Sequence, residues 1–277
     1  VEHGVTFHRL AIPPKHGLLT DHAVARRKVN ALLAQVQPQV VHAIGTGVHA
    51  YTAYRSGYPT VLTIHGVQRE DAKYLGGLRN RIHGWLQGER IERYCLRRAR
   101  HVIAISPYLL QVLPELRRAN LYHIPNPVAD SYFQLEPATD PARILCAGVL
   151  VPRKRVLDAL EAVARVRQTV PHVTIRFAGG APDPAYYQEI QKKVAELGLQ
   201  DCATFLGAVA VGPLAEEFRR AAVVLLTSSQ ETAPMAIAEG MAAGKAVVAT
   251  RVGGVPHLVQ EGVTAILTRA GAVDETV

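Results

Sequence analysis

Short apolar runs rich in β-branched residues alternate with longer amphipathic segments along the whole chain. This alternation is typical of parallel sheets whose strands are joined by helices. Strands are expected at residues 40–43, 60–64, 102–105 and 121–124, and then at 144–147, 173–178, 223–227, 246–250 and 265–267. Helices are expected at 21–36 and 78–98, in a shorter segment after Pro107, and at 156–169, 184–197, 213–221 and 234–243. The chain is therefore predicted to have an α/β fold.

A proline-rich stretch near the middle of the chain predicts two domains. Residues 125–141 contain four prolines and no sustained hydrophobic period, as expected of an interdomain linker. A chain of 277 residues also suits two domains of about 100–150 residues better than a single core. We therefore expect one Rossmann-like domain at residues 1–130 and a second at residues 131–277.

The composition excludes several classes of protein. With 48% hydrophobic and 19% charged residues, the chain is neither disordered nor fibrous. No apolar run approaches the roughly 20 residues that cross a bilayer. The three cysteines are far apart and form no Cys-x-x-Cys pair, so neither a zinc site nor a disulfide framework is supported. A cytoplasmic location fits this cysteine usage best.

The net charge of +8 belongs entirely to the first half of the chain. Residues 1–138 contain 17 Lys and Arg against 9 Asp and Glu, whereas residues 139–277 contain 14 of each. The densest basic stretch, residues 79–100, includes Arg90, Arg93, Arg97 and Arg98. One interpretation is a solvated helix face, and the other is attraction to an anionic membrane or acceptor. Nucleic acid is not an expected partner.

The most informative segment runs from residue 228 to residue 244 and reads SSQETAPMAIAEGMAAG. Pro234 suits the first turn of a helix and Gly244 its end. The helix is almost entirely apolar, so Glu239 is expected in a low dielectric, where its carboxylate needs donors from the protein or a ligand. Glu231 precedes the helix, close to N–H groups that form a ready anion site. A capping carboxylate and a structural buried acid are the alternative interpretation.

Two further candidates lie where predicted strands end. Residues 153–155 are three consecutive cations after the strand at 144–147, where ligands usually bind in open α/β sheets. His65 follows the strand at 60–64. A solvated turn and a structural histidine are the alternatives. Because the chain has no Asp-x-Asp motif, no metal or other cofactor is expected, and phosphate would be held by protein cations and helix termini.

These segments, in this order, resemble the retaining GT-B glycosyltransferases of family 4, in the glycogen-synthase-like and mannosyltransferase-like group. The matching segments include residues 40–42, 63–66, 105–106, 124–126, 148–154, 177–180, 205–207, 231–244 and 252–256. Glu231 and Glu239, with seven residues between them, are a strong match. The resemblance covers about residues 5–267 and implies two Rossmann-like domains whose parallel sheets face each other across a cleft.

The resemblance also implies a role for each candidate residue. Lys154 would hold the diphosphate of a nucleotide-sugar donor, with Arg153 or Arg155 as a second cation. Glu239 would accept hydrogen bonds from the donor ribose. Glu231 would face the transferred sugar as a catalytic residue, and His65 would approach that sugar from the other domain. The remaining donor-binding candidates are Gly148, Thr232, Ala233, Pro234 and Met235.

Some positions depart from the family pattern. Val149 stands where arginine is usual, and Thr232 and Pro127 replace glycines. The family's opening strand, glycine-rich turn and helix have no counterpart before residue 5, and the chain stops shortly after residue 267, so it resembles a copy that lacks both ends.

The expected function is metal-independent transfer of a sugar, with retention, from a nucleotide diphosphate sugar to a glycan or lipid-linked acceptor. The protein is expected to be cytoplasmic or peripheral at the inner face of the membrane. Two alternatives are a non-catalytic nucleotide-sugar-binding fragment or interaction module, and a GT-B sugar epimerase. The nucleotide base, the sugar and the acceptor are not specified by the sequence.

Overall fold

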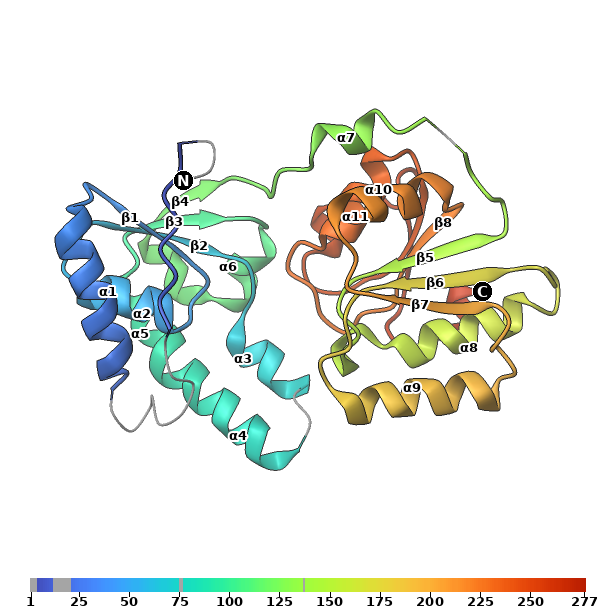
Figure 1. Ribbon diagram of the computed structural model, residues 1–277, viewed down its shortest axis with the longest axis horizontal. Coiled ribbons are helices and arrows are strands. Elements are labelled where there is room, and N and C mark those ends of the chain that lie inside the picture. Colours follow the sequence, from blue (N-terminus) through green and yellow to red (C-terminus); the bar gives the residue numbers. More distant parts are fainter. Residues whose placement is uncertain (1–3, 12–20, 75–76, 137) are drawn as a thin grey trace. The chain divides into compact units, whose positions relative to one another are not determined.

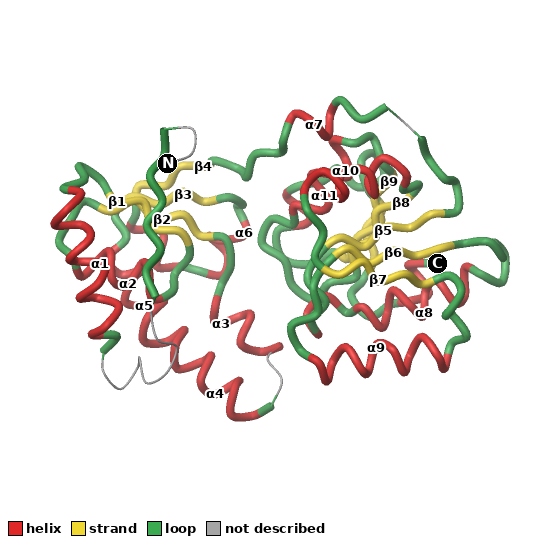
Figure 2. Tube along the Cα trace, viewed as in Figure 1, coloured by secondary structure: helices red, strands yellow, loops and turns green. Residues whose placement is uncertain are grey.

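The computed structural model describes residues 4–11, 21–74, 77–136 and 138–277. The chain divides into an N-terminal unit, Val1–Ile105 with Leu109–Ile124, and a C-terminal unit, Ser106–Tyr108 with Pro125–Val277. Each unit contains a parallel sheet with helices packed against it (Figure 1; Figure 2). The predicted α/β class with two Rossmann-like domains is confirmed. The division after Ile124 lies in the predicted linker, close to the domain boundary expected after residue 130.

The N-terminal unit has a four-stranded sheet. Its strands are β1 (Val41–Ile44), β2 (Thr60–Ile64), β3 (His101–Ala104) and β4 (Asn120–His123), paired in parallel in that order. All four lie within one residue of their predicted positions. Leu62, Ile64 and Val102 are fully buried, so the two central strands form the core of this unit.

Helices precede and connect these strands. They are α1 (Ala23–Val36), α2 (Val48–Arg55), α3 (Gln68–Asp71), α4 (Leu78–Gln87), α5 (Arg93–Arg98) and α6 (Tyr108–Val112), with the 3₁₀ turns η1 (Ala72–Tyr74) and η3 (Pro114–Arg118). Figure 1 shows α4 on the far side of the helical layer from the sheet.

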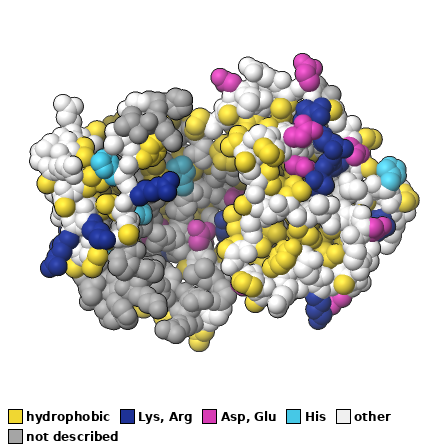
Figure 3. All heavy atoms as spheres, in the orientation of Figure 1, with side chains coloured by type: hydrophobic (Ala, Val, Ile, Leu, Met, Phe, Trp, Pro, Cys, Tyr) yellow, Lys and Arg dark blue, Asp and Glu magenta, His cyan; other side chains and the backbone are white. Residues whose placement is uncertain are grey.

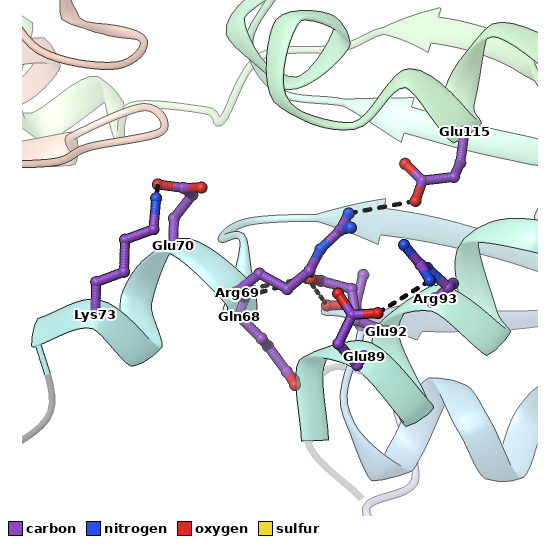
Figure 4. Close-up of polar contacts among 9 residues, drawn as sticks. Gln68, Arg69, Glu70, Lys73, Glu89, Glu92, Arg93 and Glu115 are labelled. Atoms are coloured by element: carbon purple, nitrogen blue, oxygen red, sulfur yellow. Dashed lines mark hydrogen bonds and ion pairs between the residues drawn. The ribbon is translucent and has the colours of Figure 1, made fainter. Parts of the chain in front are cut away.

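The helix expected at residues 78–98 is interrupted by a π-helical turn, η2 (Gly88–Glu92), which separates α4 from α5. The turn ends at Glu92, whose side chain is fully buried. Glu92 accepts a hydrogen bond from the backbone N–H of Gln68 (2.9 Å) and pairs with the Arg69 guanidinium (3.0 Å), both at the start of α3 (Figure 4). Residues 78–98 are thus helical throughout, as expected, but the sequence did not predict the π-helical turn, because the inward carboxylate of Glu92 depends on contacts with a distant segment.

The C-terminal unit has a six-stranded parallel sheet. Its strands are β5 (Arg143–Ala147), β6 (Thr174–Ala178), β7 (Ala203–Gly207), β8 (Val223–Leu226), β9 (Ala246–Thr250) and β10 (Ile266–Thr268), in the spatial order β10-β9-β8-β5-β6-β7. This is the doubly wound order of a Rossmann fold, whose direction reverses between β5 and β8. Strand β7 was missed in the sequence because it is a partly exposed edge strand with a weak apolar pattern.

Helices cover both faces of this sheet. The helices and turns are α7 (Asp130–Phe133), η4 (Pro152–Lys154), α8 (Val156–Val166), α9 (Pro184–Glu196), α10 (Val211–Arg220), α11 (Met235–Ala242), η5 (Val255–His257) and α12 (Val273–Thr276). Helices α8 and α9 pack on one face around Phe177, whereas α10 and α11 pack on the other around Phe218 (Figure 2). In the described part of the chain, no helix is long and apolar enough to cross a membrane.

Candidate functional site

The point where the strand order reverses brings the two most informative segments together. The loop after β5 contains Gly148 and Lys154, and the loop after β8 contains Glu231. Because β5 and β8 are parallel neighbours, both loops leave the sheet at the same edge. This crevice at the carboxyl ends of the strands is where open α/β sheets bind ligands.

The side chains of Lys154 and Glu231 are paired across this edge. Lys154 Nζ donates to Glu231 Oε1 at 2.6 Å, and Ser228 Oγ donates to the same oxygen at 2.6 Å. Arg153 Nη1 lies 3.5 Å from Glu231 Oε2 and donates to the Gln230 carbonyl at 2.5 Å. Glu231 is buried, so these donors offset the cost of removing its carboxylate from water.

Sequence reasoning did not single out two polar residues of this cluster. Ser228 is fully buried and holds Glu231, as described above. Gln230 is also buried, and its Nε2 has no hydrogen-bond partner among the described residues. Both belong to the 228–244 segment, but only their burial beside Glu231 distinguishes them from ordinary loop residues.

Two glycines allow another loop to support the Glu231 segment. Gly253 has a positive φ of 51°, and a Cβ on it would lie 1.9 Å from the Glu231 carbonyl oxygen. A Cβ on Gly254 would lie 1.8 Å from the Thr232 carbonyl oxygen. The backbone N–H of Gly254 donates to the Glu231 carbonyl at 2.9 Å. The loop after β9 thus fixes the backbone on which Glu231 stands.

Gly148 shapes the other side of the crevice. Its φ of +142° is strained for any residue with a side chain. Its N–H donates to the Ala178 carbonyl at 2.9 Å, and a Cβ on Gly179 would lie 1.9 Å from the Gly148 carbonyl oxygen. The loops after β5 and β6 therefore approach more closely than side chains would permit.

Helix α11 begins in the crevice and ends as predicted. It starts at Met235 with Pro234 as its N-cap residue, one position later than expected. The first N–H groups of any helix lack partners within the helix, so this end carries partial positive charge. At the other end Gly244 has a φ of +66°, and Lys245 N–H donates to the Gly240 carbonyl at 2.9 Å, which completes a Schellman cap.

These elements enclose a pocket of about 350 Å³ in the C-terminal unit. Among the predicted residues, its lining includes Gly148, Lys154, Pro234, Met235 and Glu239. The other C-terminal candidates, namely Arg153, Glu231, Thr232 and Ala233, lie in the adjoining loops and outside this lining. His65 belongs to the N-terminal unit, where it is exposed directly after β2.

Glu239 is a half-buried carboxylate on the wall of the pocket. Burial raises the pKa of its carboxyl, and within the described residues no donor is found for its oxygens. Tyr132 in α7 is buried, and it lies close enough that the Glu239 carboxylate adds to burial in raising the pKa of its hydroxyl. The described residues therefore do not supply the donor that Glu239 was predicted to need.

Two further observations concern cysteine and metal-ligating side chains. Burial raises the pKa of the Cys146 thiol, at the end of β5, to about 12, so it stays protonated and is a poor nucleophile at neutral pH. Within the described ranges, no three or more His, Cys, Asp and Glu side chains are grouped so that they could hold a metal ion.

Comparison with known families decides the class of this protein. Residues 1–132 match the model of Glycosyltransferase Family 4, and residues 141–277 match that of Glycosyl transferases group 1. The chain belongs to the family 4 glycosyltransferases. Its two parallel-sheet units are those of the GT-B fold, as expected from the resemblance in the sequence.

Relatives of this glycosyltransferase have names that refer to different sugar compounds. It is 28% identical over 283 residues to alpha-maltose-1-phosphate synthase of Mycobacterium tuberculosis, covering 89% of this chain and 71% of that protein. It is 35% identical over 139 residues to D-inositol 3-phosphate glycosyltransferase of Stackebrandtia nassauensis, covering 47% of this chain and 30% of that protein.

Solved structures show the same fold at lower identity. Sucrose-phosphate synthase from Thermosynechococcus elongatus has a TM-score of 0.75 at 24% identity, covering 97% of this glycosyltransferase and 71% of that chain. The Anabaena protein HepE, solved in complex with UDP and glucose, has a TM-score of 0.72 at 21% identity. The match covers 97% of this glycosyltransferase and 72% of that chain.

Proposed function

We propose that this glycosyltransferase moves a sugar from a nucleoside diphosphate sugar to an acceptor hydroxyl, with retention of anomeric configuration. The pocket at the strand-order reversal carries the proposal, because it combines a cation, a helix N-terminus and an unpartnered carboxylate in about 350 Å³. A diphosphate is anionic and suits Lys154 and the start of α11. A ribose offers hydroxyl donors and suits Glu239.

The proposed reaction depends on charge stabilisation. The bond between the anomeric carbon and the diphosphate oxygen breaks, and its electron pair leaves with the diphosphate. Lys154, with Arg153 beside it, and the N–H groups of α11 stabilise that charge. The acceptor oxygen bonds to the face from which the diphosphate leaves, and its proton passes to the leaving phosphate. This course retains configuration without a nucleophile from the protein.

The pairing of Lys154 with Glu231 is compatible with donor binding. An ammonium group has three hydrogens, so Lys154 can donate to Glu231 and to a phosphate oxygen together. The contact at 2.6 Å keeps Nζ at the pocket wall before the donor arrives. We infer that Glu231 positions Lys154 at the wall of the pocket.

A panel of nucleotide sugars tests the proposed function. Binding is measured by thermal shift with UDP-, GDP- and ADP-sugars, starting from UDP-glucose because HepE was solved with UDP and glucose. A ligand at 100 times its Kd stabilises by about 2.7 kcal/mol. Turnover is then measured as nucleotide release with glycan and lipid-linked acceptors. Binding without transfer or donor hydrolysis would support the non-catalytic module, and free sugar formed without an acceptor would support the epimerase.

Metal removal separates the proposed mechanism from a metal-assisted one. Because Lys154, Arg153 and the N-terminus of α11 are available to stabilise the diphosphate, full activity is expected in EDTA. Initial rates with and without excess EDTA, and after addition of magnesium or manganese, provide the measurement. Activity that returns only with the added metal would contradict this mechanism.

Replacement of Glu239 tests the ribose contact. Glu239→Gln is expected to weaken nucleoside diphosphate binding by roughly ten-fold, because a hydrogen bond to a charged acceptor contributes about 1.5–3 kcal/mol. Pyrophosphate binding should not change. Calorimetric titrations of both ligands provide the measurement, with Glu196→Gln at the exposed end of α9 as the matched control. Equal losses for the two ligands would rule out the ribose contact.

Glu239 should also make the stability of the fold and the affinity for nucleotides depend on pH. Burial raises the pKa of Glu239, so the fold gains stability as pH falls through that raised pKa and loses it as pH rises. Ribose hydroxyls donate to the ionised form, so nucleotide affinity should rise with pH through the same range and then level off. The rise in affinity should be absent in Glu239→Gln, as shown by titrations at several pH values.

A further inference from the structure

Helix α4 carries an apolar stripe that faces solvent. Leu78, Ile82, Trp85 and Leu86 are 73%, 50%, 55% and 46% exposed. Their spacing of four, three and one residues places them on one side of the helix. A surface helix of a globular protein usually turns such a stripe toward the core. The arrangement therefore indicates a surface that contacts something apolar.

A groove runs beside this stripe. It has a volume of about 340 Å³ and is lined by Leu78, Ile82 and Trp85 of α4, by Ala72, and by the basic residues Arg69, Lys73 and Arg81. Arg69 is held by Glu92 at 3.0 Å and by Glu115 at 3.4 Å (Figure 4). The basic residues thus border an apolar surface, as in segments that bind where lipid headgroups meet acyl chains.

The charge around α4 indicates whether its apolar partner is a lipid surface or a protein surface. Residues 72–88 contain Lys73, Arg79 and Arg81 and no Asp or Glu. On the C-terminal unit, by contrast, Figure 3 shows acidic and basic side chains beside each other. Lys73 pairs with Glu70 at 2.6 Å, so the positive charge at the groove comes from Arg81 and from the net charge of +8 over residues 1–138. An apolar stripe in such a positive field matches an anionic lipid surface better than a protein surface of mixed charge.

The arginines predicted to attract a membrane are less suited to direct contact. Arg93 pairs with Glu89 at 3.0 Å, Arg90 lies 4.0 Å from Asp21, and the Arg98 guanidinium lies 3.8 Å from the centroid of the Tyr94 ring. These contacts offer no apolar surface comparable to that of α4. They leave the α5 arginines as part of a general positive field around the N-terminal unit.

We propose that α4 docks this glycosyltransferase onto anionic phospholipid bilayers. The apolar stripe enters the boundary between headgroups and acyl chains, with Trp85 at the interface that tryptophan favours. Arg81 and Lys73 remain at the level of the lipid phosphates. The proposal concerns a surface of the N-terminal unit and goes beyond the donor chemistry.

The chain offers a direct probe, because Trp85 is its only tryptophan. The full chain is titrated with vesicles of phosphatidylglycerol and with vesicles of phosphatidylcholine, at low and high salt. We expect a blue shift of Trp85 emission, quenching by brominated acyl chains, and binding at least ten-fold stronger to the anionic vesicles. Because each basic residue near the surface contributes roughly five-fold, high salt should remove most of that difference.

Paired variants separate docking from folding and from donor binding. Ile82→Ser with Leu86→Ser is expected to reduce vesicle binding at least ten-fold and to leave nucleoside diphosphate affinity unchanged. Val211→Ser with Val263→Ser, at the exposed apolar residues of the C-terminal unit, should change neither. Because the nucleotide pocket lies in the C-terminal unit, folding of the N-terminal unit is checked separately: circular dichroism spectra and melting temperatures unchanged from the parent protein show that the variants are folded.

Three results would overturn the proposal. One is Trp85 emission that does not respond to anionic vesicles, and another is equal binding to neutral and anionic vesicles. The third is a blue shift that grows with protein concentration in the absence of lipid, since this would mean that a second copy of the chain covers the stripe.

Discussion

Replacement of Lys154 by alanine is expected to weaken nucleoside diphosphate binding by ten-fold or more and to lower the rate of sugar transfer at least as strongly. The variant loses a charge-assisted contact to phosphate, which contributes about 1.5–3 kcal/mol, and the charge on the departing diphosphate then loses its nearest ammonium. Calorimetric titration with the diphosphate and initial rates at saturating donor provide the measurements.

Lys154→Ala is also expected to destabilise the free protein, because it removes one of the donors that hold the buried Glu231. Ser228 and Arg153 remain, so we expect a loss of about 1–3 kcal/mol. A double variant with Glu231→Gln should recover much of the stability but none of the diphosphate affinity. Lys192→Ala, in an exposed pair on α9, is the matched control. Unchanged diphosphate affinity in a folded Lys154→Ala protein would remove Lys154 from the site.

Replacement of Gly254 by alanine is expected to damage the site from a distance. The new Cβ would lie 1.8 Å from the Thr232 carbonyl oxygen, so either the loop after β9 or the Glu231 segment must move. Overpacking of this kind costs about 1–3 kcal/mol, or roughly 2–12 °C in the melting temperature of the C-terminal unit. Donor binding should also weaken, since the displaced backbone carries Glu231. Calorimetry and donor titration measure the two effects.

Gly212→Ala provides the control for this variant. Gly212 lies in α10 with no atom within 4 Å of a Cβ built on it, so alanine should be neutral or slightly stabilising there. A Gly254→Ala protein as stable and as active as Gly212→Ala would mean that the close approach at Thr232 is not required.

The sequence predicted most of the fold because the relevant signals are local. Buried parallel strands are short apolar runs, and the helices that cover them have an amphipathic period. Pro234 and Gly244 predicted the two ends of α11 to within about a residue, since each acts through its own backbone angles. Features that depend on contacts between distant segments were not predicted, because they leave no local signal. The π-helical turn at Gly88–Glu92 and the edge strand β7 depend on contacts that no local pattern records.

For the site residues, too, some properties follow from the local sequence and others only from the tertiary structure. The sequence by itself determined which residue types are present: cations after one strand, and two glutamates around a short apolar helix after another. Only the tertiary structure decided that Lys154 and Glu231, 77 residues apart, form one ion pair while Glu239 faces a pocket without a partner. The physical reason is the strand order. Because β8 inserts beside β5 rather than beside β7, loops that are distant along the chain meet at one edge of the sheet, and no property of either loop alone specifies that neighbour.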